Sequence, residues 1–542
     1  MPTLNWIGKD AVVNHDKEVP FRLLKKIKAH SGGGGNSQNL IIHGDNLEAL
    51  KALMPYYQGE IKCIYIDPPY NTGNENWVYN DKVNSPKIKK WLGKVVGSEA
   101  EDLCRHDKWL CMMYPRLKLL RDLLSEDGVI FVSVDDNELS NLREIMDEIF
   151  DFKNRIDRGL VVWNNAGSTK GFRSIVKNHE YILAYAKDFE GVKNYYGKNF
   201  PDELENIDER LQIKRSPRNP LAKVKFPKGL EIEGVKDAVF EKNIGDGTNR
   251  IDIVDGSMTF KDGILQKDVV LEASFPYKNQ MIKFFEKIGT DTKTYDVKGQ
   301  EWIEVYFRKT GVPYFRKKRL MYILDSVIKD CPNSGSPDLE KLGLTNIFDN
   351  PKPVDLIVKL ISYFTDANDI ILDSFAGSGT TGHAVLELNK KTNGNRKFIL
   401  VEMEDYAKDI TAERIKLAIK KDSYNDDFEY CELDKPLFNE EGQIEEECTF
   451  EQLATYIYFT ETNINIDRKA IDKYYVGEYG ETEYYLLFKE KGKNILNKDF
   501  LKKIKNNSKK KIIYADKCLI DDKILEKYNI LFKQIPYEVK VY

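Results

Sequence analysis

The sequence predicts an α/β protein with a Rossmann-like parallel sheet, and two observations support this prediction. Short apolar segments typical of strands alternate with helix-length segments along residues 40–149. Farther along, a glycine-rich turn at 377–382 joins another apolar strand pattern to a helix-like stretch. Such alternation favours a parallel sheet that is covered by helices on both faces.

Each element follows from a local pattern. The first series of strands is expected at 40–43, 62–66, 128–134, 161–163 and 180–186, with helices near 46–54, 108–124 and 138–149. The second series has a strand at 369–373, a helix from 380 to 388 and a strand at 398–401. The interval between the two series breaks this rhythm, because it is richer in charge, glycine, proline and long loops.

The first candidate site is the sequence Asp-Pro-Pro-Tyr, which directly follows the strand at 62–66. Asp67 therefore lies where a parallel strand ends and a ligand crevice opens. Pro68 and Pro69 stiffen the turn and lack N–H donors, so its carbonyls stay free to accept hydrogen bonds. The Asp67 carboxylate and the Pro68 carbonyl can bind the hydrogens of an exocyclic amine and return its delocalised lone pair to nitrogen. Tyr70 can stack on the ring that carries the amine.

The second candidate site is the glycine-rich turn. Gly377, Gly379 and Gly382 have the GxGxxG spacing that lets the backbone at a helix N-terminus approach a dinucleotide cofactor. Glu402 ends the next strand, where a carboxylate is suited to accept hydrogen bonds from ribose hydroxyls. Both a nicotinamide dinucleotide and S-adenosyl-L-methionine carry such a ribose, so this pattern alone leaves the cofactor open.

Together, the two motifs resemble the amino-methyltransferases of DNA in the permuted class called β, in which the catalytic motif precedes the cofactor motif. The chain also resembles the modification subunit of type III restriction-modification systems, and the resemblance covers most of the chain except its middle. It extends to six further segments: 43–50, 71–81, 105–117, 127–138, 349–353 and 532–537.

The resemblance implies a role for each matching residue. The target amine would be bound by Asp67, Pro68, Pro69 and Tyr70. The cofactor S-adenosyl-L-methionine would be bound by Asp45 at its adenine, Lys352 at its methionine end, Glu402 at its ribose, and Asp373, Phe375, Gly377 and Gly379 in the loop. From the residues alone, Asp45 is also explained as a helix cap and Lys352 as a solvated lysine.

The implied reaction is direct methyl transfer to an adenine N6 amine in a short DNA sequence. A base within a duplex cannot present its amine to such a pocket, so the target must be flipped out. Adenine is preferred because aspartate opens the motif, whereas related cytosine-N4 enzymes usually have serine there; cytosine N4 remains the alternative. The reaction needs no metal and no covalent nucleophile, since alignment and the loosened lone pair suffice.

We expect four domains. Residues 1–187 would form the catalytic half, 188–345 an inserted target-recognition domain, 346–435 the cofactor-binding half, and 436–542 a C-terminal α+β accessory domain. The net charge of −4 does not exclude DNA binding, because phosphates need only local basic clusters. The DNA-binding residues expected in the insert are Lys214, Arg215, Arg218, Arg316, Lys317, Lys318 and Arg319.

Composition narrows the class of protein. No segment approaches eighteen consecutive apolar residues and the first residues do not resemble a signal peptide, so we expect a cytoplasmic protein without a membrane segment. Seven cysteines without CxxC spacing indicate neither a disulfide framework nor a zinc site. Double-stranded DNA is the expected partner, and the resemblance also implies a homodimer and a restriction (helicase-nuclease) subunit.

Two other functional classes stay open at this point. A nicotinamide-linked oxidoreductase explains the glycine turn and Glu402 but leaves Asp67 and Tyr70 without a purpose. A non-catalytic DNA-specificity subunit explains the basic insert but not the intact Asp-Pro-Pro-Tyr motif. The sequence contains no GxxxxGK[ST] loop, so a translocating ATPase is not expected within this chain.

Overall fold

Most of the chain is described by the computed structural model. The described residues are 3–32, 38–71, 93–95, 104–165, 177–192, 207–211, 219–245, 250–290, 292–296, 300–318, 324–422, 424, 426–438, 444–445, 448–466, 471–489, 493–504 and 507–535. They form two compact units. One unit contains Met1–Asn194 together with Leu324–Tyr542, and the other is Tyr195–Ile323.

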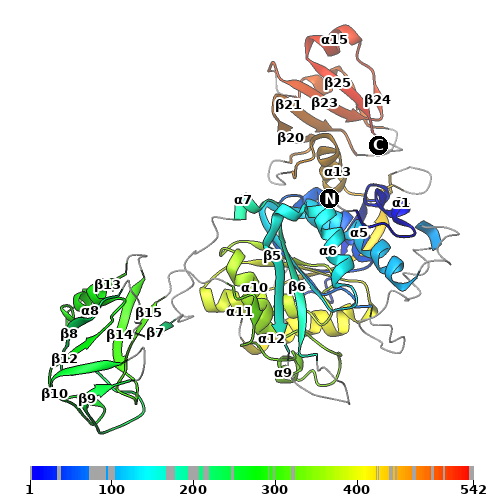
Figure 1. The fold of residues 1–542 in the computed structure, drawn as a ribbon. Helices are drawn as coiled ribbons and strands as arrows, with labels where there is room; N and C mark the ends of the chain where they lie inside the picture. The colour runs from blue at the N-terminus through cyan, green and yellow to red at the C-terminus, as the bar shows by residue number, and fades with distance from the viewer. Residues whose placement is uncertain are drawn as a thin grey trace. The chain divides into compact units, whose positions relative to one another are not determined.

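A ten-stranded mixed sheet organises the first unit (Figure 1). In spatial order its strands are β1 (Arg22–Lys26), β19 (Glu429–Pro436), β2 (Leu40–His43), β18 (Lys397–Glu402), β17 (Ile370–Asp373), β3 (Ile61–Ile66), β4 (Leu124–Val134), β6 (His179–Ala186), β5 (Arg155–Asn164) and β16 (Val327–Ile328). The strands before the two motifs, β3 and β17, are parallel neighbours, with Leu372 opposite Ile64. The fold therefore joins two motifs that lie far apart in the sequence.

The strands predicted for this sheet are confirmed, but the sheet is mixed rather than wholly parallel. β6 runs antiparallel to both of its neighbours, β4 and β5, and β1 runs antiparallel to β19. Because β6 pairs directly with the strand that precedes it in the chain, the chain reverses its direction there. The first residues of β6 consequently lie at the edge where the parallel strands end.

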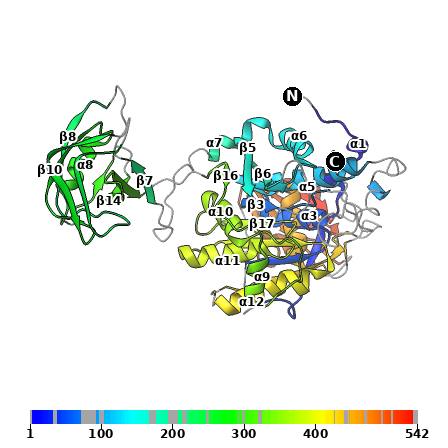
Figure 2. The same ribbon diagram turned by 60° about the horizontal axis from the view of Figure 1, so that its bottom comes forward.

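Helices cover both faces of the sheet, as the alternation predicts. One face carries α3 (Asn46–Tyr57), α5 (Arg105–Leu123) and α6 (Leu139–Phe150), and the other carries α10 (Val354–Phe364), α11 (Thr380–Thr392) and α12 (Glu413–Asp422). Figure 2 shows α5 and α6 on one side of the strands and α10 and α11 on the other. Alternate side chains of β3 serve the two cores: Ile64 and Ile66 face the first set of helices, and Cys63 and Tyr65 face the second.

The second unit is a β-rich body with its own core. Its larger sheet contains β8 (Ala222–Phe226), β9 (Ala238–Ile244), β10 (Ile251–Lys261), β11 (Ile264–Leu265) and β12 (Val269–Ala273), and its smaller sheet contains β7 (Ile207–Leu211), β13 (Thr294–Tyr295), β14 (Glu301–Phe307) and β15 (Pro313–Lys318). Its core contains aromatic side chains among a larger number of aliphatic ones. The rings of Trp302 and Phe315 stack with centroids 4.1 Å apart. The compact unit lies within the expected insert, residues 188–345.

The C-terminal part of the first unit has a separate small sheet, as expected for an α+β module. The sheet contains β20 (Tyr475–Tyr479), β21 (Thr482–Leu486), β23 (Lys510–Ala515) and β25 (Ile530–Gln534), and α13 (Phe450–Thr462) packs against it. The strand predicted at 484–488 is β21, shifted by two residues. Phe21, from the N-terminal segment, packs edge-on against Tyr456 of α13.

Two classes of feature are absent from the described residues. None of the described helices combines the length and apolar character needed to cross a lipid bilayer. The described residues also contain no group of three or more histidine, cysteine or carboxylate side chains arranged to hold a metal ion.

Candidate active site

The carboxyl ends of four parallel strands bring the predicted site residues to one edge of the sheet. Asp67 directly follows β3, Asp373 ends β17 and Glu402 ends β18. Asp45 follows the end of β2 by two residues. Because β2, β18, β17 and β3 are parallel neighbours, their carboxyl ends lie side by side.

Lys352 is the direct partner of Asp67. Its Nζ donates to both carboxylate oxygens, at 2.9 and 2.8 Å. The lysine side chain is only 10% exposed. Burial alone would lower the pKa of Lys352, but the carboxylates of Asp67 and Glu180 outweigh it and raise the pKa. Lys352 is therefore a buried ammonium held by two acids rather than a solvated surface lysine.

The turn after Asp67 is fixed by side chains from other elements. Trp109 of α5 donates from its indole nitrogen to the Pro69 carbonyl at 2.7 Å. The Tyr70 hydroxyl donates to Oε2 of Glu180 at 2.9 Å, and burial raises the pKa of that hydroxyl. No described residue donates to the Pro68 carbonyl. The Pro68 carbonyl thus keeps the acceptor capacity that the amine site requires.

The chain leaves this turn through a left-handed residue. Asn71 has a φ of +57°, a conformation that asparagine tolerates better than most residues. Its side-chain amide donates to the Arg105 carbonyl at 3.2 Å and to the fully buried carboxylate of Glu138. Glu138 also pairs with Nδ1 of His106 at 2.6 Å. The Asp-Pro-Pro-Tyr turn is consequently anchored at both ends.

The glycine turn has the backbone conformation that its sequence predicts. Gly377 and Gly379 have φ values of +52° and +82°, which favour glycine. A Cβ on Gly379 would lie 3.1 Å from the Thr411 carbonyl oxygen, so a side chain there would crowd backbone. The Thr411 hydroxyl donates to the Gly377 carbonyl at 2.6 Å. Phe375, at the start of the turn, packs partly buried against the core.

A buried arginine forms hydrogen bonds with side chains of this turn. Arg414 of α12 is fully buried, and its Nη1 donates to the hydroxyls of Ser378 and Thr380 at 2.8 Å each. Burial lowers the pKa of Arg414 to about 10. The arginine thereby ties α12 to the first turn of α11.

Two carboxyl groups at the strand ends have raised pKa values. Burial raises the pKa of Asp373 to about 7, although Thr381 and the Phe375 N–H donate to it. Burial likewise raises the pKa of Glu402 to about 7, although the N–H groups of Gly377 and Glu404 donate to it at 2.8 and 2.9 Å. Each is therefore a buried acid that lies beside the glycine turn.

Asp45 caps a helix and also lines a cavity. Its carboxylate accepts from the N–H groups of Leu47 and Glu48, which cap α3, and Arg116 lies 3.3 Å from its second oxygen. The cavity beside it, of about 870 Å³, is also lined by Met403. An adenosine-containing cofactor fits this edge, because the glycine turn, the buried Glu402 and the cavity at Asp45 follow one another along adjoining strands.

The loop that carries Lys352 is clamped from both sides. The Gly335 N–H donates to the Pro351 carbonyl at 2.8 Å. The Thr380 hydroxyl donates to the Lys352 carbonyl at 3.1 Å. The loop backbone is therefore held between the glycine turn and a residue that sequence alone places in the insert.

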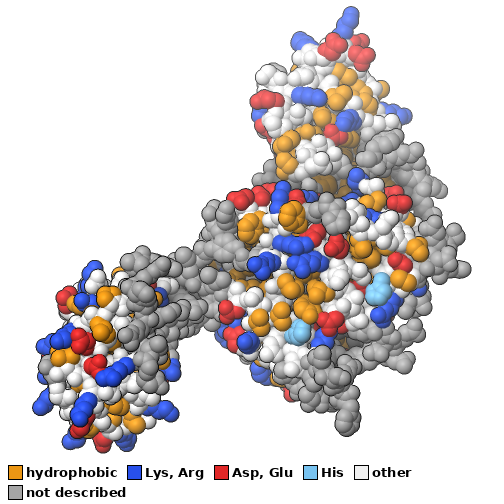
Figure 3. All heavy atoms as spheres, viewed as in Figure 1, with side chains coloured by type: hydrophobic (Ala, Val, Ile, Leu, Met, Phe, Trp, Pro, Cys, Tyr) orange, Lys and Arg blue, Asp and Glu red, His pale blue; other side chains and the backbone are white. Residues whose placement is uncertain are grey.

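The expected DNA-binding residues are only partly described. Lys214, Arg215, Arg218 and Arg319 lie outside the described residues. Arg316 donates to Glu304 at 2.7 Å and stacks over Tyr306, while Lys317 is 8% exposed and pairs with Asp296. Lys318 lies beside them, half-buried at the end of β15. On the drawn face of this unit, basic and acidic side chains are interspersed (Figure 3). The DNA-binding role of Arg316, Lys317 and Lys318 stays a prediction.

Four residues that hold the site were not singled out from the sequence: Arg116, Glu138, Glu180 and Arg414. Each is charged, and Arg116 and Glu180 adjoin apolar runs, whereas Glu138 and Arg414 have charged or polar neighbours. A buried charge is retained only when it is paired, so a charge that adjoins an apolar run, as for Arg116 and Glu180, is a signal of a polar network. That signal does not reveal which site the network serves.

Comparison with known proteins places these residues in a family context. The sequence model of the DNA methylase family matches residues 61–413. The Mod subunit of the type III restriction-modification enzyme EcoP15I from Escherichia coli is 32% identical over 75% of this chain and 65% of that protein. The EcoPI Mod subunit of Escherichia phage P1 is 30% identical over 74% of this chain and 64% of that protein. The matched part of the chain thus spans slightly less than two thirds of these relatives.

Among solved structures, the PvuII DNA methyltransferase, described as cytosine-N4-specific, aligns with 72% of this chain and 92% of its own. The sequence identity is 12% and the TM-score 0.34. A likeness this remote has no bearing on which base is the target.

Proposed function

Since the chain belongs to the DNA methylase family, whose members use S-adenosyl-L-methionine, we propose that it methylates adenine N6 at a short DNA sequence. We propose further that it acts as the modification subunit of a type III restriction-modification system, in line with its similarity to two such subunits. The observation that carries the proposal is the adjacency of the Asp-Pro-Pro-Tyr turn and the glycine turn on neighbouring parallel strands.

The amine would be activated by two acceptors on one turn. The Asp67 carboxylate and the Pro68 carbonyl accept its two hydrogens, so the nitrogen lone pair leaves the ring system and points toward the methyl donor. Tyr70 holds the flipped ring, and its own orientation is fixed through its hydroxyl. These groups act mainly by alignment, because they are in place before the substrate arrives.

The cofactor would lie across the ends of β17, β18 and β2. S-adenosyl-L-methionine supplies an electrophilic methyl group when bound. Glu402 would accept from the ribose hydroxyls, the turn at Gly377 and Gly379 would pass beside the cofactor, and Asp45 would reach the adenine. Lys352 lies on the Asp67 side of the turn, where it would neutralise the carboxylate of the methionine end.

The remaining parts of the proposal concern partners. The unit Tyr195–Ile323 would recognise the target sequence, since it forms a compact unit of its own between the catalytic and cofactor halves. A restriction subunit and a second copy of this chain are proposed partners on the strength of the type III relatives.

The test is long-read sequencing of DNA from a methylation-free host that expresses the chain. N6-methyladenine is expected at one short motif, and it should disappear in a host that expresses Asp67→Ala, because that variant loses the charged acceptor. Lys502→Ala is the control, since Lys502 is exposed and pairs with nearby Asp499 in the C-terminal part of the first unit. Methylation at cytosine N4 would correct the target base, and the absence of any modified base in all three hosts would contradict the proposal.

Cofactor affinity is expected to rise with pH. Glu402 has a pKa of about 7 without cofactor, whereas a ribose hydroxyl donating to its carboxylate favours the ionised form. Binding therefore releases a proton, and affinity for S-adenosyl-L-methionine should increase by up to roughly tenfold between about pH 6 and about pH 8. Calorimetric titration across this range measures the slope.

The variant Glu402→Gln isolates this contribution. Glutamine cannot ionise, so the part of the pH dependence of affinity that is due to residue 402 should vanish, while any contribution of Asp373 or of the cofactor itself remains. If the affinity for S-adenosyl-L-methionine changes equally with pH in the unaltered chain and in Glu402→Gln, a hydrogen bond between Glu402 and the cofactor is ruled out.

The effect of pH on folding stability has the opposite sign. Because the folded pKa of Glu402 lies above its ordinary 4.5, the protonated acid favours folding below that value, and this contribution is lost as the pH rises through about 7.

A further inference from the structure

Glu180 joins two residues of the candidate active site. Its Oε2 accepts the Tyr70 hydroxyl at 2.9 Å and lies 3.4 Å from Nζ of Lys352. Its other oxygen, Oε1, accepts from the side-chain amide of Asn165 at 2.8 Å. The carboxylate therefore has a fixed orientation and a direct contact with each of the two groups that flank Asp67.

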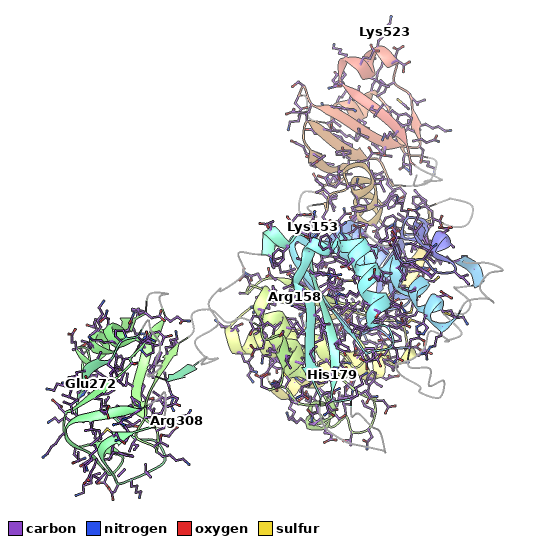
Figure 4. All side chains as sticks on the ribbon, viewed as in Figure 1. Lys153, Arg158, His179, Glu272, Arg308 and Lys523 are labelled. Carbon is purple, nitrogen blue, oxygen red and sulfur yellow. The ribbon has the colours of Figure 1, made fainter. Side chains whose placement is uncertain are left out.

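The position of Glu180 follows from the direction of β6. Glu180 is the second residue of that strand, and it lies opposite Trp163 near the end of β5. Because β6 is antiparallel to β4 and β5, its first residues lie at the edge of the sheet where β3 ends and Asp67 follows. His179, the residue before Glu180, is labelled at the start of this strand in Figure 4.

The arrangement contains a competition for Asp67. Lys352 donates to both oxygens of Asp67, and the target amine needs an oxygen of the same carboxylate. An ammonium binds a carboxylate more strongly than a neutral amine does, because its hydrogen bonds are charge-assisted. The amine gains full access when Lys352 shifts toward another carboxylate. Glu180 is within reach of the ammonium, and it is available whether or not the methionine carboxylate of the cofactor also faces Lys352.

We propose that Glu180 is a positioning residue for methyl transfer, which holds the Tyr70 hydroxyl and receives the Lys352 ammonium when the target amine occupies Asp67. This inference rests on the proposed function, since it concerns the same site. Glu180 touches neither the base nor the cofactor, and it acts through Tyr70 and Lys352. With Glu180 present, the Lys352 ammonium has a second carboxylate beside Asp67. Lys352 therefore stays paired when the target amine takes its place at Asp67.

The first test compares Glu180→Gln, Glu180→Ala and Tyr70→Phe in the full chain, assayed on DNA that contains the methylated motif. The kcat of Glu180→Ala should fall about 10- to 100-fold, while the KM for S-adenosyl-L-methionine stays within about twofold. Glu180→Gln should be intermediate, because its amide oxygen still accepts a hydrogen bond but carries no charge. In the Tyr70→Phe background, Glu180→Ala should cause a further loss, since the contact with Lys352 is independent of the hydroxyl.

The matched control is Glu483→Gln. Glu483 is also a buried carboxylate that accepts from a tyrosine hydroxyl, that of Tyr485 at 2.9 Å, but it belongs to the C-terminal sheet. Its kcat should equal that of the unaltered chain. The inference is overturned if Glu180→Ala retains full kcat, if its loss disappears in the Tyr70→Phe background, or if cofactor binding is lost in parallel.

A second measurement does not depend on methyl transfer. The rate at which acetic anhydride modifies Lys352, followed by peptide mass spectrometry, reports how firmly the amine is held as a charged group. The rate should increase in Glu180→Gln and remain unchanged in Glu483→Gln. An unchanged rate in both variants overturns the inference. If the unaltered chain methylates no DNA, the proposed function fails, and this measurement still decides whether Glu180 holds Lys352.

Discussion

Replacing Lys352 by methionine is expected to abolish methylation and to lower the free energy of unfolding by about 3 kcal/mol. Methionine fills a similar volume but leaves the Asp67 and Glu180 carboxylates without the cation that both face. Removing one partner of a buried ion pair is costly because the other charge stays buried and uncompensated. Loss of methylation is measured with purified protein and DNA of the methylated motif, and stability by chemical denaturation.

Lys359→Met provides the control for this substitution. Lys359 pairs with Asp330, whose side chain is 68% exposed, so water can replace the lost contact. Its change in stability should stay below about 1 kcal/mol. The double variant Lys352→Met with Asp67→Asn should be more stable than Lys352→Met alone, because it removes one of the two uncompensated charges. If the double variant loses as much stability, relative to the unaltered chain, as Lys352→Met and Asp67→Asn lose in total, Lys352 and Asp67 are not coupled.

Gly335→Ala is the second substitution with a large expected effect. A Cβ at this position would lie 2.2 Å from the Lys352 carbonyl oxygen and 2.9 Å from that of Pro351. Both atoms belong to backbone, so no side-chain rotation can relieve the clash, and the loop that carries Lys352 must move. We expect a loss of about 2 kcal/mol in stability and roughly a 100-fold fall in methylation rate, since displacements near 1 Å can cost that much.

The conformation of Gly335 makes this test specific. Its φ of −88° is accessible to alanine, so the penalty arises from crowding and not from backbone strain. Gly191→Ala is the matched control, because Gly191 has ordinary backbone angles and its added Cβ would meet only normal contacts of 3.4 Å or more. Equal activity of the two variants would show that the loop accommodates the methyl group, and hence that Gly335 does not set the position of Lys352.

The catalytic and cofactor motifs were predictable because each rests on local rules. A strand followed by Asp67 and two prolines, or by closely spaced glycines, restricts the backbone within a few residues, and the structure has those turns where they were expected. The alternation of apolar patterns likewise located the strands and helices of the sheet to within a few residues. The adjacency of β3 and β17 was implied only by the resemblance to a known family.

The contacts that complete the site could not be predicted, because they depend on strand direction and on long-range packing. Glu180 begins an apolar strand, and in a parallel sheet that end would lie away from Asp67; only the antiparallel direction of β6 brings it near. Gly335 was assigned to the insert because of its composition, yet it contacts the Lys352 loop. Neither the proximity of Glu180 to Asp67 nor the contact of Gly335 with the Lys352 loop is marked by a pattern in the adjacent sequence.

The way the second unit is joined to the chain bears on how such proteins diversify. The chain leaves the large sheet after β6 and rejoins it at β16, and both strands flank β5 at one side of the sheet. The strands that carry Asp67, Asp373 and Glu402 are not interrupted by this connection. Residues 195–323 therefore form a cassette, and recombination at its two junctions would exchange it between relatives while the chemistry of the sheet is inherited intact.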